Sequence, residues 1–234
     1  MIAASGIELR AGAQLLLGDA SFRVGKGDRV GLVGRNGAGK TTLTRALAGE
    51  TIPAKGTISS SGTVGYLPQD PSSGNPDELA RDRILSARGL HEVVRRMQDA
   101  SMRMDEPDEA ERERIIARYA RAEAEFEALG GYAVESEAAT IAASVGLPDR
   151  VLSQPLGTLS GGQRRRVELA RILFSGADVL LLDEPTNHLD ADSVRWLRKF
   201  LSTYDGGFIV ISHDTALLED TVNKVWHLDA NRRE

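Results

Sequence analysis

The sequence predicts an α/β fold with a mostly parallel sheet and an inserted helical segment. Three observations support this prediction. Short apolar runs typical of buried strands alternate with helix-forming stretches near both ends of the 234-residue chain. A glycine-rich loop at 34–41 directly follows one of these runs. Between residues 70 and 158 the composition changes, because much of this segment is charged, poor in glycine and helical in its periodicity.

Residues 1–69 are expected to contain short strands and a loop that opens a helix. Between residues 7 and 24, short β-prone pieces alternate with glycines, and a buried strand at 28–33 leads into the loop. The other elements expected here are a helix at 41–48 and strands at 57–59 and 64–67.

The loop contains the residue types that bind a nucleoside triphosphate. Its glycines allow backbone N–H groups to surround phosphate oxygens, and Lys40 would bring a cation to the β and γ phosphates. The hydroxyl of Thr41 can ligate magnesium. The residues expected to bind the nucleotide are Gly34, Asn36, Gly37, Ala38, Gly39, Lys40, Thr41 and Thr42.

Two amphipathic helices are expected within 70–158, where they should form an antiparallel hairpin at about 78–129. Apolar residues recur there at three-and-four spacing: Leu90, Val93, Val94, Met97 and Met104, then Ile115, Ile116, Tyr119, Ala122, Phe126 and Leu129. Pro107 suits the first turn of the second helix. Residues 78–127 include thirteen acids and ten arginines, so we expect a solvated hairpin and not a basic nucleic-acid clamp.

Residues 159–234 contain a second set of residues suited to nucleotide binding and hydrolysis. An apolar strand at 179–182 ends in Asp183 and Glu184, at the place where open α/β sheets bind ligands. Beside a phosphate loop, Asp183 is suited to the magnesium shell and Glu184 to orienting an attacking water. A second anion site is expected where small residues precede a helix, with Ser160 as its N-cap. Its residues are Ser160, Gly161, Gly162 and Gln163.

These motifs, together with Gln69 and with His213 after a strand at 208–211, follow the order found in one family. The chain resembles an ATP-binding-cassette ATPase, a P-loop NTPase with an N-terminal β subdomain, along nearly its whole length. The resemblance implies that ATP and Mg²⁺ are bound and that Thr41, Gln69 and Asp183 serve the metal. It also implies that Gln69 links the metal to the helical subdomain, that Glu184 acts on the water and that His213 senses the γ phosphate.

The same resemblance implies that two cassettes enclose two ATP molecules, with residues 160–163 of one covering the γ phosphate bound by the other. A single cassette should therefore hydrolyse ATP weakly unless it meets a second copy or a partner cassette.

The run from Thr186 through Asn187, His188 and Leu189 to Asp190 resembles the ABC-F branch, soluble proteins that act on ribosomes. The long insertion resembles the arm-bearing helical subdomain of that branch. The resemblance implies the N-terminal cassette of a two-cassette protein, with a ribosome as partner. Translation regulation and antibiotic protection both remain open, as do a transporter ATPase subunit and a nucleotide-gated scaffold, although Glu184 and His213 speak against the scaffold.

Composition excludes several further classes of protein. The net charge of −5 provides no global basic field for a polyanion. No apolar run approaches the roughly 20 residues of a membrane span and no basic leader is present, so we expect a cytoplasmic protein. The absence of cysteine excludes disulfides, thiolate catalysis and cysteine metal sites.

One position departs from the family pattern. Cassettes commonly place an aromatic residue near Arg10 and Ala11 to stack on adenine, and none stands there. Unless Arg10 or a leucine replaces it, modest ATP affinity and loose base selectivity are expected.

Overall fold

The structure is a computed structural model that describes residues 1–69, 74–105 and 107–229. The chain divides into two compact units. The first comprises Met1–Ser72 and Gly176–Glu234, and the second is Ser73–Ser175. The second unit therefore runs past the boundary at 158 expected from the sequence, because the helix that follows this point packs with the other helices of the insertion.

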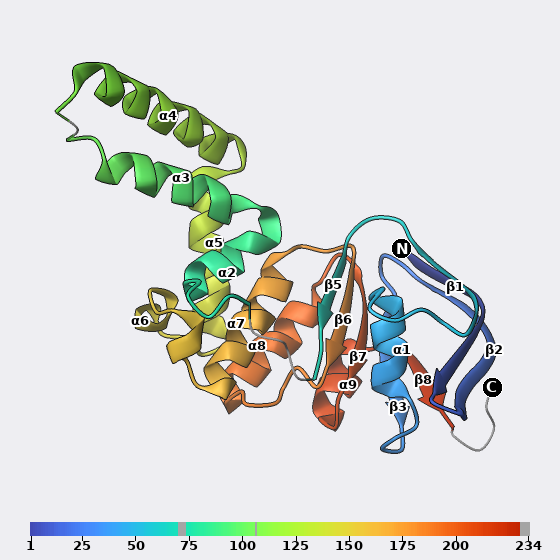
Figure 1. Cartoon of the computed structure of the whole chain (residues 1–234). Coiled ribbons are helices and arrows are strands. Elements are labelled where there is room, and N and C mark those ends of the chain that lie inside the picture. The colour runs from blue at the N-terminus through green and yellow to red at the C-terminus, as the bar shows by residue number, and fades with distance from the viewer. Residues whose placement is uncertain (70–73, 106, 230–234) are drawn as a thin grey trace. The chain divides into compact units, whose positions relative to one another are not determined.

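The first unit contains a five-stranded sheet in the order β5-β6-β7-β3-β8 (Figure 1). Its strands are β3 Arg29–Gly34, β5 Val64–Leu67, β6 Val179–Asp183, β7 Gly207–Ile211 and β8 Lys224–Leu228. All neighbouring pairs run parallel. Every residue of β6 and β7 is buried, as central parallel strands require. The predicted α/β fold with a parallel sheet is confirmed.

A second, antiparallel sheet has the order β2-β1-β4, formed by β1 Ile2–Ala11, β2 Gln14–Val24 and β4 Lys55–Ser60. The expected breaks at glycines between 7 and 25 are confirmed at Gly12, in the turn between β1 and β2, and at Gly25, after β2, but the expected break at Gly18 was wrong. Gly18 is inside β2, and Gly6 is inside β1 at φ +56°, where the register between β1 and β2 shifts. The irregularity at Gly6 is accommodated as a bulge and does not end the strand.

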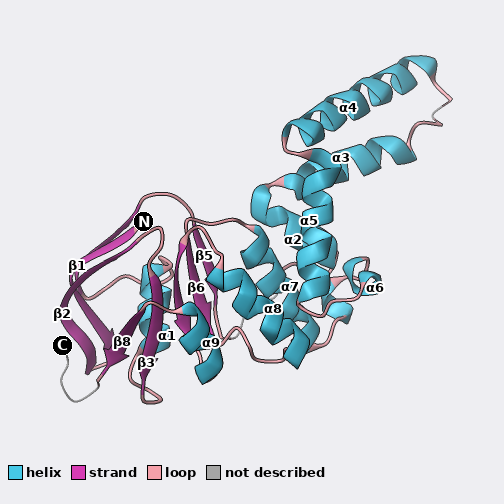
Figure 2. Ribbon diagram, turned by 180° about the vertical axis from the view of Figure 1, so that it is seen from behind, coloured by secondary structure: helices cyan, strands magenta, loops and turns pink. Residues whose placement is uncertain are grey.

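Helices cover both faces of the parallel sheet in the first unit (Figures 1 and 2). Helix α1, Lys40–Leu47, contacts β1 of one sheet and β3 and β6 of the other. On the opposite face, Leu218 of α9, Thr215–Thr221, approaches Gly31 of β3. Helix α8, Ala191–Ser202, packs against α9. This arrangement confirms the predicted layers.

The second unit is helical within its described residues. Its helices are α2 Ala80–Leu85, α3 Leu90–Met102, α4 Glu109–Ala128, α5 Gly131–Ser144, α6 Asp149–Leu152 and α7 Gly161–Phe174. Short 3₁₀ turns occur at Ser86–Arg88 and Leu156–Thr158. Helices α2 and α5 pack on α7, while α3 and α4 form the predicted hairpin (Figure 2). The short helices α2 and α6 were not predicted.

The start of α4 differs from the prediction. Pro107 lies before the helix and not in its first turn, because Asp108 is the N-cap. The Asp108 carboxylate accepts a 3.0 Å hydrogen bond from the Ala110 N–H, which supplies a partner for an otherwise unpaired helical amide.

Candidate active site

A cleft of about 430 Å³ in the first unit contains most of the predicted site residues. It lies at the carboxyl ends of β6 and β7 and at the start of α1. The predicted residues that line it are Asn36, Gly37, Gly39, Lys40, Thr41, Thr42, Gln69, Asp183, Glu184 and His213. Gly34 and Ala38 are not among the lining residues.

Gly34 shapes the loop through its backbone. It ends β3 at φ +155°, and a Cβ on it would lie 2.5 Å from the Leu228 carbonyl oxygen of the neighbouring strand β8. Ala38 is 2% exposed and packs in the core beneath the loop. Both residues therefore position the loop and do not face the cleft.

The loop folds back over its own lysine. Gly37 and Gly39 have φ values of +79° and +101°, which glycine adopts without steric penalty. Lys40 Nζ donates hydrogen bonds to the carbonyl oxygens of Gly34 at 2.7 Å and Arg35 at 3.1 Å. These contacts hold the ammonium group above the loop, where a phosphate oxygen can replace a carbonyl oxygen as its partner.

Thr41 and Asp183 supply the oxygen atoms that a magnesium ion requires. Thr41 Oγ1 donates a 2.7 Å hydrogen bond to Asp183 Oδ2, and Asp183 is 1% exposed. Mg²⁺ is usually bound by one or two protein oxygens, with waters and phosphate oxygens completing its shell. Gln69 lines the same cleft and offers an amide oxygen. The donor set fits this ion.

Glu184 is held in a defined position beside His213. Its backbone is in the left-handed region at φ +50°, and its N–H donates to the Ile211 carbonyl oxygen at 2.8 Å. The Glu184 carboxylate accepts a 3.3 Å hydrogen bond from the His213 N–H, and His213 Nε2 lies 3.3 Å from Glu184 Oε1. The strained backbone directs a mostly buried carboxylate to the cleft.

The turn after Glu184 connects the site to α8. The Asn187 N–H donates to the Glu184 carbonyl oxygen at 3.3 Å, and His188 has φ +69°. The side chain of Asp190 caps α8 by accepting a 2.8 Å hydrogen bond from the Ser193 N–H. Asn187 lines the cleft. It was noted in the sequence only as a marker of the ABC-F branch.

Residues from the antiparallel sheet complete the cleft. Ala11 ends β1, while Gln14 and Leu16 belong to β2. No motif in the sequence indicated Gln14. Arg10 is not a lining residue, and its Nε donates to Glu8 Oε1 at 2.6 Å. The sequence analysis offered Arg10 or a leucine in place of the missing aromatic residue. Leu16 lines the cleft, and Arg10 does not.

The predicted second anion site belongs to the other unit. Ser160 is the N-cap of α7, as the sequence predicts, and forms a capping box with Gln163. Ser160 Oγ accepts from the Gln163 N–H at 3.2 Å, and the Ser160 N–H donates to Gln163 Oε1 at 2.9 Å. The side chains and the N–H groups of Ser160 and Gln163 are thus used in the cap, whereas a Cβ built on Gly161 would meet no atom within 4 Å, so the space beside this residue is open.

With this geometry established, comparison with known proteins identifies the family. The sequence model described as "ABC transporter" matches residues 17–187. The chain belongs to the family of ABC transporter ATPase cassettes. Members of this family bind ATP, use Mg²⁺ and hydrolyse the nucleotide.

Two curated relatives match over nearly the whole chain. The energy-dependent translational throttle protein EttA of Haemophilus influenzae is 37% identical over 94% of this chain and 39% of its own length. The tylosin resistance ATP-binding protein TlrC of Streptomyces fradiae is 36% identical over 96% of this chain and 41% of its own length. The chain thus spans about two fifths of these relatives.

Solved structures share the fold. A dimeric, post-hydrolysis structure of the ATP-binding cassette MJ0796 bound to ADP and Pi aligns with a TM-score of 0.65 at 17% identity, covering 98% of this chain and 95% of the other. Among the residues that the structure describes, no helix has the length and apolar character needed to cross a membrane.

Proposed function

We propose that this cassette binds Mg²⁺-ATP in the cleft of the first unit and hydrolyses it as part of a protein that acts on the ribosome. The observation that carries the chemistry is that the cleft joins the phosphate loop, the Thr41 and Asp183 pair, and the Glu184 and His213 pair. Binding, metal and water-activating groups thus share one site.

The proposed role of each residue follows from its position. The loop amides and Lys40 bind the phosphates, with Lys40 exchanging its carbonyl partners for phosphate oxygens. Thr41, Asp183 and Gln69 hold the metal, which neutralises charge on the β and γ phosphates when bound. Glu184 orients and polarises the attacking water, and His213, whose side chain is 74% exposed, contacts the γ phosphate.

A second cassette is proposed to complete the site. Residues 160–163 would cover the γ phosphate of the partner cassette, so an isolated chain should turn over slowly. The dimeric state of MJ0796, a protein of the same fold, is consistent with this proposal. The partner is either a second cassette in the same longer chain or a second copy.

Two features support the proposal that the protein acts on the ribosome. The relative EttA is named a translational throttle protein and TlrC a tylosin resistance protein. The turn 186–190 and the α3–α4 hairpin also resemble the ABC-F branch. This proposal includes the N-terminal position within a two-cassette protein, a cytoplasmic location, and either translation control or antibiotic protection as the biological role.

The alternative is an ATPase subunit of a transporter, which the family description "ABC transporter" supports. The two functions differ in the partner that the protein binds when ATP is present. A transporter subunit should co-purify with a membrane permease, whereas a ribosome-acting protein should sediment with ribosomes.

The test uses Glu184→Gln, which should retain ATP and block its hydrolysis. A general base contributes about 10²- to 10⁴-fold to rate, so phosphate release should fall by at least about a hundredfold. In light scattering with Mg²⁺-ATP, this variant of the 234-residue chain should form a dimer. Glu219→Gln, an exposed change on α9, serves as the control and should hydrolyse like the unmodified chain.

The ribosome proposal is tested with the full-length protein that contains this cassette. With Glu184→Gln and ATP, it should co-sediment with ribosomes, and it should not do so with ADP. Equal recovery with ATP and ADP, or recovery with a membrane permease in place of ribosomes, would contradict the proposal.

A further inference from the structure

The hairpin formed by β1 and β2 contributes one polar side chain, Gln14, to the cleft. Of the described lining residues, Ala11, Gln14 and Leu16 come from this hairpin. Every other one belongs to the phosphate loop, to the start of α1 or to the segments at the carboxyl ends of β5, β6 and β7. We propose that the side-chain amide of Gln14 binds the purine base of the nucleotide at position 6 and accepts adenine and guanine alike. This inference rests on the proposed function, because it requires that the cleft bind a nucleoside triphosphate.

The three hairpin residues present their side chains on one face. Ala11 and Gln14 are paired directly across the turn between β1 and β2. Side chains of directly opposite residues lie on the same face of an antiparallel pair, as do side chains two residues apart in one strand. Leu16 follows Gln14 by two residues, so the face consists of two apolar side chains and one amide.

Leu16 holds this face beside the phosphate loop. It is 6% exposed, and a Cβ built on Gly39 would lie 3.1 Å from its Cβ and Cδ1 atoms. Gly39 is the N-cap of α1, so the hairpin packs where the loop becomes the helix. A nucleotide whose phosphates bind at the start of α1 therefore has this face as a neighbour.

The direction of the phosphate chain places the base at the hairpin. In the proposed function, Glu184 and His213 act beside the γ phosphate, and Lys40 and the loop amides bind the phosphates. The base is at the opposite end of a nucleotide from its γ phosphate. The hairpin supplies the part of the lining that has no phosphate, metal or water role, and its apolar side chains suit contact with a purine ring.

The Gln14 amide can match either purine because it contains both kinds of hydrogen-bonding group. Its carbonyl oxygen accepts and its NH₂ group donates. Adenine has an amino donor at position 6, whereas guanine has a carbonyl acceptor there. Position 6 is thus the place where both purines have a polar substituent and where their polarity is reversed.

Nothing in the described structure fixes the orientation of this amide. Gln14 is exposed, and across residues 1–69, 74–105 and 107–229 its side chain forms no hydrogen bond. The amide is therefore able to rotate and present its oxygen to adenine or its nitrogen to guanine. This freedom gives a physical basis for loose selectivity between ATP and GTP.

The experiment replaces the amide with groups that have only one kind of hydrogen-bonding capacity. Gln14→Glu provides a carboxylate, which only accepts, and Gln14→Lys provides an ammonium group, which only donates. Calorimetric titration of the 234-residue chain with Mg²⁺-ATP and with Mg²⁺-GTP gives two dissociation constants for each variant. A new charge acts equally on both triphosphates, so its general effect cancels in the ratio of the two constants.

The unmodified chain should bind ATP and GTP within about fivefold of each other. Relative to this ratio, Gln14→Glu should shift the preference at least about fivefold toward ATP, and Gln14→Lys should shift it at least about fivefold toward GTP. This size corresponds to the gain or loss of one hydrogen bond. Thermal denaturation checks that both variants remain folded, as expected for an exposed residue on the edge strand β2.

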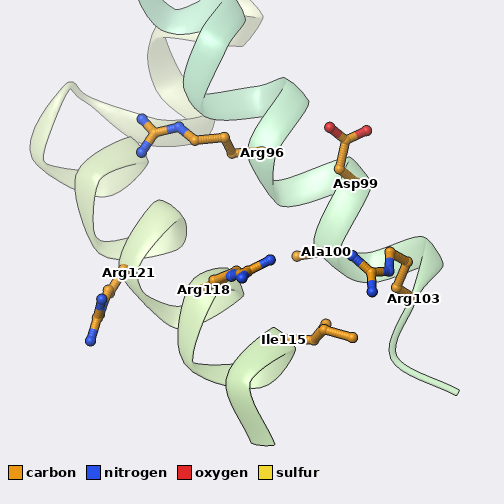
Figure 3. Close-up of a pocket in the computed structure, with 7 residues that line it drawn as sticks. All are labelled: Arg96, Asp99, Ala100, Arg103, Ile115, Arg118 and Arg121. Atoms are coloured by element: carbon orange, nitrogen blue, oxygen red, sulfur yellow. The ribbon is translucent and has the colours of Figure 1, made fainter. Parts of the chain in front are cut away.

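Gln98 supplies charge-matched controls. It is an exposed glutamine on α3 in the second unit and does not line the cleft. It precedes Asp99, whose side chain points away from the space between α3 and α4 (Figure 3). Gln98→Glu and Gln98→Lys should leave the ratio of the two dissociation constants unchanged.

The proposal is overturned if the shifts at Gln14 are smaller than about fivefold, go in the same direction or are the reverse of those expected. A preference of more than about fivefold in the unmodified chain would also overturn it, because the amide would then be fixed. Binding of both nucleotides with unaltered ratios in the variants would remove the role of Gln14 and leave the proposed function in place. Binding of neither nucleotide by the unmodified chain would remove both.

Discussion

Thr41 Oγ1 and Asp183 Oδ2 lie 2.7 Å apart although 142 residues separate them in the sequence. Thr41 lies in the first turn of α1 after the phosphate loop, and Asp183 ends β6. The hydrogen bond between them therefore joins the two halves of the proposed metal site. It also preorganises both oxygen atoms, which reduces the rearrangement required when a metal and phosphates bind.

Thr41→Val and Asp183→Asn should each weaken ATP binding in the presence of Mg²⁺. The first removes a hydroxyl ligand and the second removes the negative charge that attracts the ion. We expect a roughly ten- to hundredfold loss of affinity, the effect of about 1.5 to 3 kcal/mol for contacts with charged groups. Calorimetric titration with ATP measures this loss.

The same titration with a chelator present supplies the decisive comparison. Without Mg²⁺, the two variants should bind ATP about as well as the unmodified chain, because their proposed role is to hold the metal. Thr57→Val, an exposed change on β4, should leave both titrations unaltered. Losses of equal size with and without Mg²⁺ would show that Thr41 and Asp183 support the loop and not the ion.

Ala11→Tyr should strengthen ATP binding. Ala11 is exposed at the end of β1 and lines the cleft, in the region where an aromatic residue is missing. Stacking of a base on an aromatic side chain is worth about 1 to 3 kcal/mol, which corresponds to a roughly five- to hundredfold gain. Calorimetry with ATP and GTP should also show weak discrimination by the unmodified chain.

Ala13→Tyr is the matched control for this change. Ala13 lies in the turn between β1 and β2, is exposed, and does not line the cleft. It should leave the affinity for both nucleotides unchanged. A strong preference of the unmodified chain for ATP over GTP would contradict the expected loose selectivity and would show that Gln14 or Leu16 already recognises the base.

The phosphate loop and the Asp183–Glu184 pair could be predicted because each depends on a short local pattern. A strand followed by a glycine-rich loop and a helix predicts the conformation of the phosphate loop. A buried strand that ends in two acids predicts that these acids lie at the carboxyl edge of the sheet. The pairing of Thr41 with Asp183 needed only the further rule that carboxyl ends of parallel strands share one edge of the sheet.

Other features depend on contacts that a local pattern does not contain. Gly18 interrupts the β-prone pattern but remains in a strand because β2 pairs along its length with β1. Gln14 and Leu16 reach the cleft only because the antiparallel sheet lies beside the loop.

Glu168→Gln should destabilise the second unit. Glu168 is 5% exposed, and its two carboxylate oxygens accept hydrogen bonds from Arg83 Nε at 2.6 Å and Arg171 Nε at 2.8 Å. Burial lowers the pKa of Arg83, but the interactions with Glu168 outweigh this effect and hold the pKa above its ordinary value. Removing the carboxylate charge leaves two guanidinium groups close together.

Breaking a fully buried ion pair costs about 3 to 5 kcal/mol, and partial solvent access to both arginines reduces the expected loss to about 2 kcal/mol. Chemical denaturation followed by circular dichroism measures it. Glu137→Gln is the control, because Glu137 pairs with Arg88 through two 2.8 Å hydrogen bonds at the surface and should contribute less than about 1 kcal/mol. Equal losses in the two variants would refute the importance of burial at Glu168.

Asp178 should make the stability of the first unit depend on acid pH. Its carboxylate accepts hydrogen bonds from the Thr63 N–H at 2.7 Å and from Thr63 Oγ1 at 3.0 Å, just before β5 and β6 begin. These bonds favour the charged form and hold the pKa of Asp178 below its ordinary value of 3.8.

Because the pKa is lower in the folded state, the stabilisation is fully present above 3.8 and is lost as the pH falls through the folded value. Asp178→Asn should therefore be less stable than the unmodified chain at neutral pH, and the two should converge as the pH falls below 3.8. Thermal denaturation across this range tests the prediction. Asp205→Asn, a change at an exposed aspartate before β7, is the control and should show no such convergence. A difference in stability between Asp178→Asn and the unmodified chain that stays constant with pH would rule out the ionic contribution of Asp178.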